Sequence, residues 1–180
     1  IRDWQIRRLG QAESELRFHG SRWAPDRSIT SGYCQIRRRQ LVGEVHDENC
    51  AALGGEAGHC GIFGTGMGLC RYLHRWFSSE SGRRLLEANV KLIIPLDKTP
   101  DGQKPNEALL GLRQGADFSS ETFFNGHTAG HLGFTGTAFW VHPQRGKYAI
   151  LLTNRTACGR INPAIRHLRR AVFQQLASLL

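Results

Sequence analysis

A chain of 180 residues, 40% hydrophobic and 22% charged, has the size and balance of one globular domain with a buried core. No apolar run is long enough to span a membrane as a helix and the N-terminus has no signal-peptide pattern, so we expect no membrane partner. The net charge of +9 comes mostly from arginine, and we interpret blocks such as 37–39 and 166–170 as a solvated basic face because no zinc-finger, ribonucleoprotein or heptad signature accompanies them.

The first half of the chain predicts more loop and helix than strand. Residues 1–40 show no sustained hydrophobic period and predict mostly loop. Residues 41–64 pass from a short apolar run into a polar cluster and then a glycine-rich loop. Thr65 is a good N-cap for a helix to about Phe77, whose apolar positions share one face. A second helix is expected at 81–90, followed by a proline- and glycine-containing loop at 95–107.

The polar cluster holds four candidate residues of a loop beside a binding pocket: His46, Asp47, Asn49 and His59. Their side chains are suited to hold a loop through hydrogen bonds to the backbone. Asp47 and its neighbours could also bind a metal together with His59, but Asp47 as the N-cap of a short helical turn is the favoured interpretation. We therefore expect neither a metal nor a cofactor.

The second half predicts an antiparallel sheet. A short strand is expected at 109–113, followed by a polar connection at 115–125. A strongly β-forming run predicts a strand from Phe134 to His142. A hairpin turn at 143–146 should lead into a second strand at 147–153, where consecutive apolar residues indicate burial on both faces.

The chain is expected to end in a helix that packs on this sheet. Asn162 is its predicted N-cap, with Pro163 at the first helical position, where proline is favoured. The helix has a continuous apolar stripe at Ile165, Leu168, Val172, Leu176 and Leu179. An antiparallel sheet with flanking helices makes the predicted fold class α+β.

The five cysteines are expected to be free thiols. Their number is odd and no two form a C-x-x-C pair, so neither a zinc ribbon nor a disulfide scaffold is predicted; they are Cys34, Cys50, Cys60, Cys70 and Cys158. Free buried thiols are typical of a reducing compartment and favour a cytoplasmic location.

The stretch from Gly126 to Thr137 organises the chain, because it places glycines and histidines just before the predicted sheet hairpin. Glycine in or beside a strand lets a second backbone or a ligand come close, so the stretch is a candidate wall of a binding site. The alternative is that its glycines only make a bulge and a turn.

No complete catalytic motif is present. The chain has no G-x-S-x-G, no serine followed three positions later by lysine, no Tyr-x-Asn, no Walker loop and no H-E-x-x-H.

Several segments nevertheless resemble the serine β-lactamase and penicillin-binding-protein superfamily, in its class C β-lactamase and carboxylesterase-like branch. HLGFTGT at 131–137 resembles the third active-site motif, in which His-x-Gly often replaces Lys-Thr-Gly. The GFTGT run favours this register over the earlier triplet at 127–129. GEVHDENCAALGG at 43–55 and AGHCGIFGT at 57–65 resemble the family's VHDENA and AGHAGLFST segments. FWVHP and LLTNR, which begin at Phe139 and Leu151, resemble its hairpin.

The resemblance covers roughly residues 41–180 and implies part of a β-lactamase/transpeptidase-like fold. In that family Ser-x-x-Lys and a Tyr-x-Asn or Tyr-x-Ser motif precede the segments found here, so the chain is expected to lack the nucleophile. The start at Ile1, not Met, likewise indicates a fragment or processed piece. The expected division is a poorly matched loop region at 1–40, part of a helical region at 41–107, and strands with the C-terminal helix at 108–180.

The resemblance also implies roles for five residues. The N–H of Phe134 would be one oxyanion-hole donor, a contribution of roughly 3 to 4 kcal/mol. Gly133 would leave room for the acyl group. His131 would replace the lysine and donate a hydrogen bond to the substrate or catalytic tyrosine, but near neutral pH it carries only part of a charge. This weakens the case for a substrate carboxylate, as does Leu132 in place of a hydroxyl residue, so esterase activity on a small ester or amide substrate is favoured over β-lactamase activity. Leu132 and Thr135 would contact the substrate.

Three functions remain open from the sequence. The first is an enzyme fragment that acts through an acyl-enzyme once completed by the missing N-terminal portion of its domain. The second is a non-catalytic relative that serves as a binding module. The third, which we favour least, is a basic nucleic-acid-binding domain.

Overall fold

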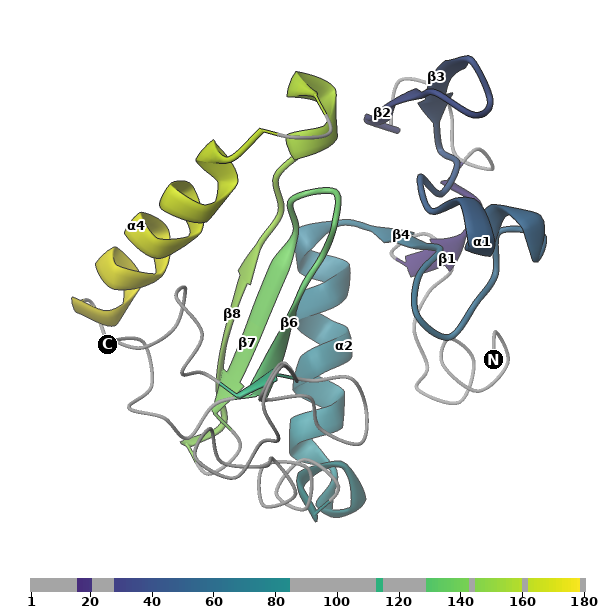
Figure 1. Ribbon diagram of the computed structural model, residues 1–180. Coiled ribbons are helices and arrows are strands. Elements are labelled where there is room, and N and C mark those ends of the chain that lie inside the picture. Colours follow the sequence, from purple (N-terminus) through teal and green to yellow (C-terminus); the bar gives the residue numbers. More distant parts are fainter. Residues whose placement is uncertain are drawn as a thin grey trace, which may run out of the picture. The chain divides into compact units, whose positions relative to one another are not determined.

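Figure 1 shows the computed structural model of the protein, which describes residues 16–20, 28–84, 113–114, 129–142, 145–159 and 162–178. Within these ranges the fold is mixed, with short antiparallel sheets and a few helices. Contacts between Cα atoms divide the chain into two compact units. The first holds Ile1–Leu73, Phe134–Gly136 and Leu152–Asn162, and the second holds His74–Gly133, Thr137–Leu151 and Pro163–Leu180. Among the described helices, none is long and apolar enough to cross a membrane.

Four short strands form two antiparallel pairs in the first unit. They are β1 (Leu16–Phe18) with β4 (Ile62–Gly64), and β2 (Thr30–Cys34) with β3 (Arg39–Val42). The expectation of mostly loop at 1–40 was therefore wrong at β1, at β2 and at the first two residues of β3, while residues 1–15 and 21–27 lie outside the described part of the chain. Leu16 and Phe18 are buried on one face of β1, as a strand requires. A strand of only three residues is too short for this alternation to stand out in the sequence.

Two predicted N-caps are present in the first unit. Its helices are α1 (Glu48–Ala52), the beginning of α2 (Gly66–Ser78) and the 3-10 helix η6 (Arg155–Cys158). The Asp47 carboxylate accepts a hydrogen bond from the N–H of Cys50 at 2.7 Å. The Thr65 hydroxyl accepts one from the N–H of Gly68 at 3.0 Å. Both side chains satisfy N–H groups that a helix start leaves without an internal partner.

A four-stranded antiparallel sheet forms the centre of the second unit (Figure 1). Its order is β5 (Arg113–Gln114), β6 (Ala129–Leu132), β7 (Ala138–His142) and β8 (Lys147–Leu151). His142 pairs with Lys147 across the predicted hairpin turn, which confirms the hairpin. The backbones of β6 and β7 approach closely at Gly130, where an added Cβ would overlap the carbonyl oxygen of Phe139. This glycine is required by strand pairing.

Helix α4 (Ala164–Ser178) packs against this sheet, as predicted. Phe173 is fully buried in one cluster with Ala138, Trp140 and Ala149. The predicted apolar stripe was wrong at Leu168, which is 45% exposed while Arg169 is 7% exposed, and its last position, Leu179, lies outside the described residues. The buried face of α4 therefore includes a charged residue, Arg169, between Ile165 and Phe173.

The predicted strand from Phe134 to His142 begins only at Ala138. Residues 134–136 form a turn, closed by a hydrogen bond from the N–H of Gly133 to the carbonyl oxygen of Thr137 at 2.7 Å. Gly136 has a φ of +112°, a conformation that L side chains rarely adopt and that ends the extended backbone. The following strand is also shorter than expected and ends at Leu151, with Leu152 exposed.

Some predicted elements fall wholly or partly outside the described residues. Of the second helix at 81–90, residues 81–84 are helical and the remainder lies outside. The loop at 95–107, the polar connection at 115–125 and most of the strand at 109–113 lie outside as well. The same holds for the beginning of the Gly126–Thr137 stretch, up to residue 128.

Candidate functional site

His131 stands on β6 with its side chain exposed, opposite Phe139 of β7. Leu132 points to the other face of the sheet, since successive side chains of a strand alternate. It packs against the buried cluster around Trp140. The structure therefore does not bring Leu132 to the face that carries His131, and the predicted substrate contact of Leu132 has no support in this arrangement.

The turn after β6 is fixed by a buried arginine of α4. Nη2 of Arg169 donates hydrogen bonds to the carbonyl oxygens of Gly133 at 2.8 Å and Thr137 at 2.7 Å. A Cβ on Gly133 would overlap the Thr137 hydroxyl oxygen, so a side chain at this position would displace that of Thr137 irrespective of any ligand. Sequence reasoning missed Arg169; the available signal was its position four residues from both Ile165 and Phe173 on the buried face of the helix.

The hydrogen bond to Gly133 also orients the N–H of Phe134, because both belong to one peptide group. A trans peptide is planar, and its C=O and N–H point in opposite directions. The carbonyl of this group points at the Arg169 guanidinium. The Phe134 N–H is consequently directed away from the guanidinium in an orientation that the helix holds in place.

The ring of Phe134 contacts two side chains of the first unit, His46 and Arg155. The centroid of the His46 imidazole lies 5.6 Å from that of Phe134, with the planes tilted by 48°. The Arg155 guanidinium carbon lies 4.6 Å from the Phe134 centroid, a cation–π geometry, and the Arg155 N–H donates to the carbonyl oxygen of Thr135 at 2.7 Å. Thus Phe134 and His46, two residues predicted to belong to one site, are in contact.

The backbone at His46 is held in place by the side chain of Arg37. Arg37 donates through Nη2 to the carbonyl oxygens of Val45 at 2.9 Å and His46 at 3.0 Å. The imidazole is 3% exposed, and its Nδ1 has no hydrogen-bond partner among the residues that the structure describes. A buried polar nitrogen in this condition marks a position where a ligand or a water would be favourable.

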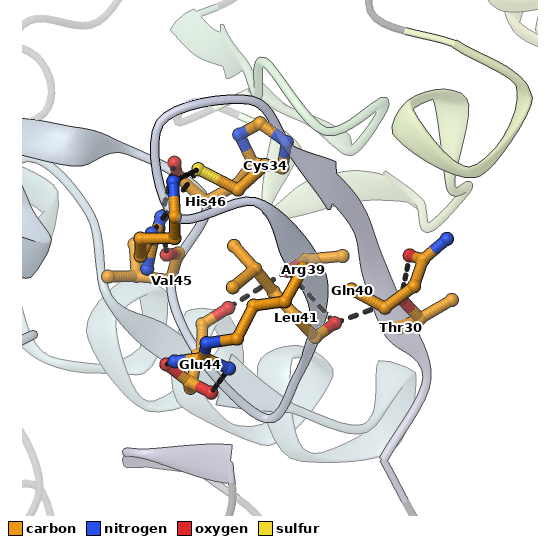
Figure 2. Close-up of polar contacts among 10 residues, drawn as sticks. Thr30, Cys34, Arg39, Gln40, Leu41, Glu44, Val45 and His46 are labelled. Atoms are coloured by element: carbon orange, nitrogen blue, oxygen red, sulfur yellow. Dashed lines mark hydrogen bonds and ion pairs between the residues drawn. The ribbon is translucent and has the colours of Figure 1, made fainter.

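Figure 2 shows the polar contacts around the β2–β3 hairpin that supports His46. The backbone N–H and Nε of Arg37 donate to Sγ of Cys34 at 3.4 and 3.3 Å. The backbone hydrogen bond from Arg37 is the main reason that the pKa of the Cys34 thiol is lowered. Arg39 forms a two-pronged ion pair with Glu44, at 2.5 and 2.7 Å. These contacts fix the hairpin and the segment that leads to His46.

Of the other predicted loop residues, Asp47 and Asn49 lie at the start of α1, and His59 lies in the segment between α1 and β4. Oδ1 of Asp47 lies 3.3 Å from Nε2 of His59 and also accepts the Cys50 N–H. That backbone hydrogen bond is the main reason that the pKa of the Asp47 carboxyl is lowered, and His59 lowers it further. Asn49 is exposed on α1. The structure thus unites Asp47 with His59, and the contribution of Asn49 is a backbone hydrogen bond that lowers the pKa of the Asp47 carboxyl.

Cys60 joins this pair and was not predicted as a site residue. A ligand atom of Asp47, one of His59 and the Sγ of Cys60 all lie within 4.8 Å of one another. Burial is the main cause that raises the pKa of the Cys60 thiol to about 12, with the neighbouring Cys50 adding to it. The available signal was the adjacency of Cys60 to His59.

Comparison of the chain with known protein families, with curated proteins and with solved structures gives no match. A function must therefore be argued from the residues of the chain and their geometry.

Proposed function

We propose that the chain forms the C-terminal part of a serine hydrolase domain with a β-lactamase/transpeptidase-like fold, related to class C β-lactamases and carboxylesterases. The substrate is a small ester or amide, cleaved through an acyl-enzyme. The proposal starts from the sequence segments around His46, His59 and His131 that resemble this family. Because Ser-x-x-Lys is absent from the sequence, a further portion of the domain supplies the nucleophile, and the chain alone is inactive.

One observation carries the proposal: the peptide group between Gly133 and Phe134 is held by the buried Arg169. An oxyanion hole needs a donor that is already oriented before charge develops on the substrate, since a donor that must reorient loses much of its effect. The Phe134 N–H meets this requirement. The neighbouring guanidinium also polarises the peptide group and makes its N–H a stronger donor.

In the proposed reaction, the turn after β6 stabilises the transition state and His131 contacts the substrate. The serine oxygen of the missing portion attacks the substrate carbonyl, and the Phe134 N–H stabilises the resulting oxyanion together with the N–H of that serine. His131, exposed on β6, donates a hydrogen bond to the substrate or to the catalytic tyrosine. The alcohol or amine leaves, and water then hydrolyses the acyl-enzyme. Thr135 is placed by its carbonyl contact to Arg155 and flanks the acyl group.

The test uses the complete product of the gene that encodes this chain. A fluorophosphonate probe should label a single serine in a Ser-x-x-Lys motif of that product, and should label no serine in the 180-residue chain. His131→Ala should lower the turnover of a small ester, whereas the exposed control His167→Ala should leave it unchanged. A true start codon near Ile1, or stoichiometric labelling of the chain itself, would reject the proposal.

A further inference from the structure

We infer that Asp47, His59 and Cys60 bind a divalent transition-metal ion of the zinc type. The ligand atoms of these three residues lie within 4.8 Å of one another, although Asp47 is 12 residues from His59 in the chain. Imidazole nitrogen, thiolate sulfur and carboxylate oxygen are the ligands that zinc takes in proteins. Neither a helix cap nor a turn accounts for all three side chains meeting at one point.

The separations fit a tetrahedral ion. Ligand atoms about 2.0 to 2.3 Å from a tetrahedral zinc are about 3.3 to 3.8 Å from each other. Oδ1 of Asp47 and Nε2 of His59 are already at 3.3 Å. The widest separation in the group is at most 4.8 Å, so a side-chain movement of about 1 Å completes the geometry.

The capping role of Asp47 is compatible with metal binding. A carboxylate offers about four lone-pair sites on its two oxygens. The Cys50 N–H takes one lone pair of Oδ1, and the ion takes the place of the His59 contact at that oxygen. The cap holds the Asp47 side chain in one orientation, and a ligand whose orientation is fixed in advance loses less entropy when it binds.

A close backbone approach brings the other two ligands to Asp47. Gly61 has a φ of +106°, and a Cβ on it would overlap the carbonyl oxygen of Gly55 and lie 3.2 Å from Sγ of Cys50. Only glycine allows the chain after Cys60 to pass this closely beside α1. His59 and Cys60 are thereby placed beside the first turn of that helix.

The arrangement has a protected side and an open side. Cys50 is fully buried, and its Sγ lies 3.5 Å from the carbonyl oxygen of Cys60. The His59 side chain is 55% exposed. Three protein ligands and a solvent-facing fourth position describe a site in which water or a small ligand completes the coordination. This site does not depend on the proposed hydrolase activity.

The test is a titration of the reduced 180-residue chain with Co²⁺, which replaces zinc and reports its ligands by absorbance. We expect one equivalent to bind, with a thiolate-to-cobalt charge-transfer band and the visible bands of a tetrahedral ion, and Zn²⁺ to displace it. Cys60→Ser should remove the charge-transfer band and weaken binding by about tenfold or more. The matched control Cys158→Ser, at an exposed cysteine, should change neither.

Asp47→Asn separates metal binding from folding, because asparagine caps helices as well as aspartate. We expect this variant to keep the far-ultraviolet circular dichroism of the wild type and to bind Co²⁺ about tenfold more weakly or worse. The inference is overturned if the wild type binds no stoichiometric Co²⁺. It is also overturned if the charge-transfer band survives in Cys60→Ser, or if Asp47→Asn binds as tightly as the wild type.

Discussion

Arg169 donates two hydrogen bonds through one nitrogen, to the carbonyl oxygens of Gly133 at 2.8 Å and Thr137 at 2.7 Å. These two residues begin and end the turn between β6 and β7, and the arginine comes from a helix more than 30 residues further along the chain. A single buried guanidinium therefore fixes both ends of the turn that carries Phe134.

Replacing Arg169 with methionine should destabilise the chain by about 3 kcal/mol, because two carbonyl groups lose a charged donor in a buried environment. Urea unfolding followed by circular dichroism measures the change. Arg166→Met, on the exposed side of the same helix, should change the free energy of unfolding by less than about 0.5 kcal/mol. Equal effects of the two substitutions would contradict the role given to Arg169.

Gly136→Ala should also destabilise the chain, by about 3 kcal/mol or more. The φ of Gly136 is +112°, and a Cβ there would lie 2.6 Å from the Thr153 hydroxyl oxygen and 2.8 Å from the Arg155 nitrogen. Backbone strain and overpacking each cost about 1 to 3 kcal/mol. Gly146→Ala is the control, because Gly146 also has a positive φ but no atom within 4 Å of the added Cβ. Its cost should be about 1 kcal/mol, from the left-handed conformation alone.

The Arg39–Glu44 ion pair predicts a defined pH dependence. The hydrogen bond from Arg39 is the main reason that the pKa of the Glu44 carboxyl is lowered. The stability that this pair contributes is present above the unfolded glutamate pKa of about 4.3 and is lost as the pH falls through the lowered folded pKa. A ¹³C NMR titration should therefore find the Glu44 midpoint below that of an ordinary glutamate.

In Arg39→Gln the Glu44 midpoint should rise toward the ordinary value. Arg38→Gln removes an exposed neighbouring charge that has no hydrogen bond to Glu44 among the described contacts, and it should move the midpoint less. A larger shift in the Arg38 variant would mean that net charge, not the ion pair, sets this pKa.

Local signals in the sequence predicted the helix starts and the sheet hairpin well. Asp47 and Thr65 cap their helices through contacts with residues three positions away, and His142 meets Lys147 across a short turn. Such features depend on near neighbours, so the pattern of residue types contains enough information to find them.

Features that depend on distant partners were missed. Arg169 was assigned to the solvated face because arginine is usually exposed, yet its partners lie at Gly133 and Thr137, which no local pattern connects to it. Cys60 is a free thiol, as predicted, but no cysteine spacing in the sequence indicates that it lies beside Asp47 and His59. Its proximity to Asp47 arises from the loop that closes onto α1.

The most direct test of the proposed acyl-transfer site removes a single hydrogen-bond donor, the backbone N–H of residue 134. In the complete gene product, Phe134 is replaced by its α-hydroxy acid analogue, so that an ester links Gly133 to residue 134 and the N–H is lost while the ring stays. We predict a fall in kcat for a small ester of about 10² to 10³, with KM little changed and with folding verified by urea unfolding. An unchanged kcat in a folded protein would contradict the assignment of the Phe134 N–H as an oxyanion donor.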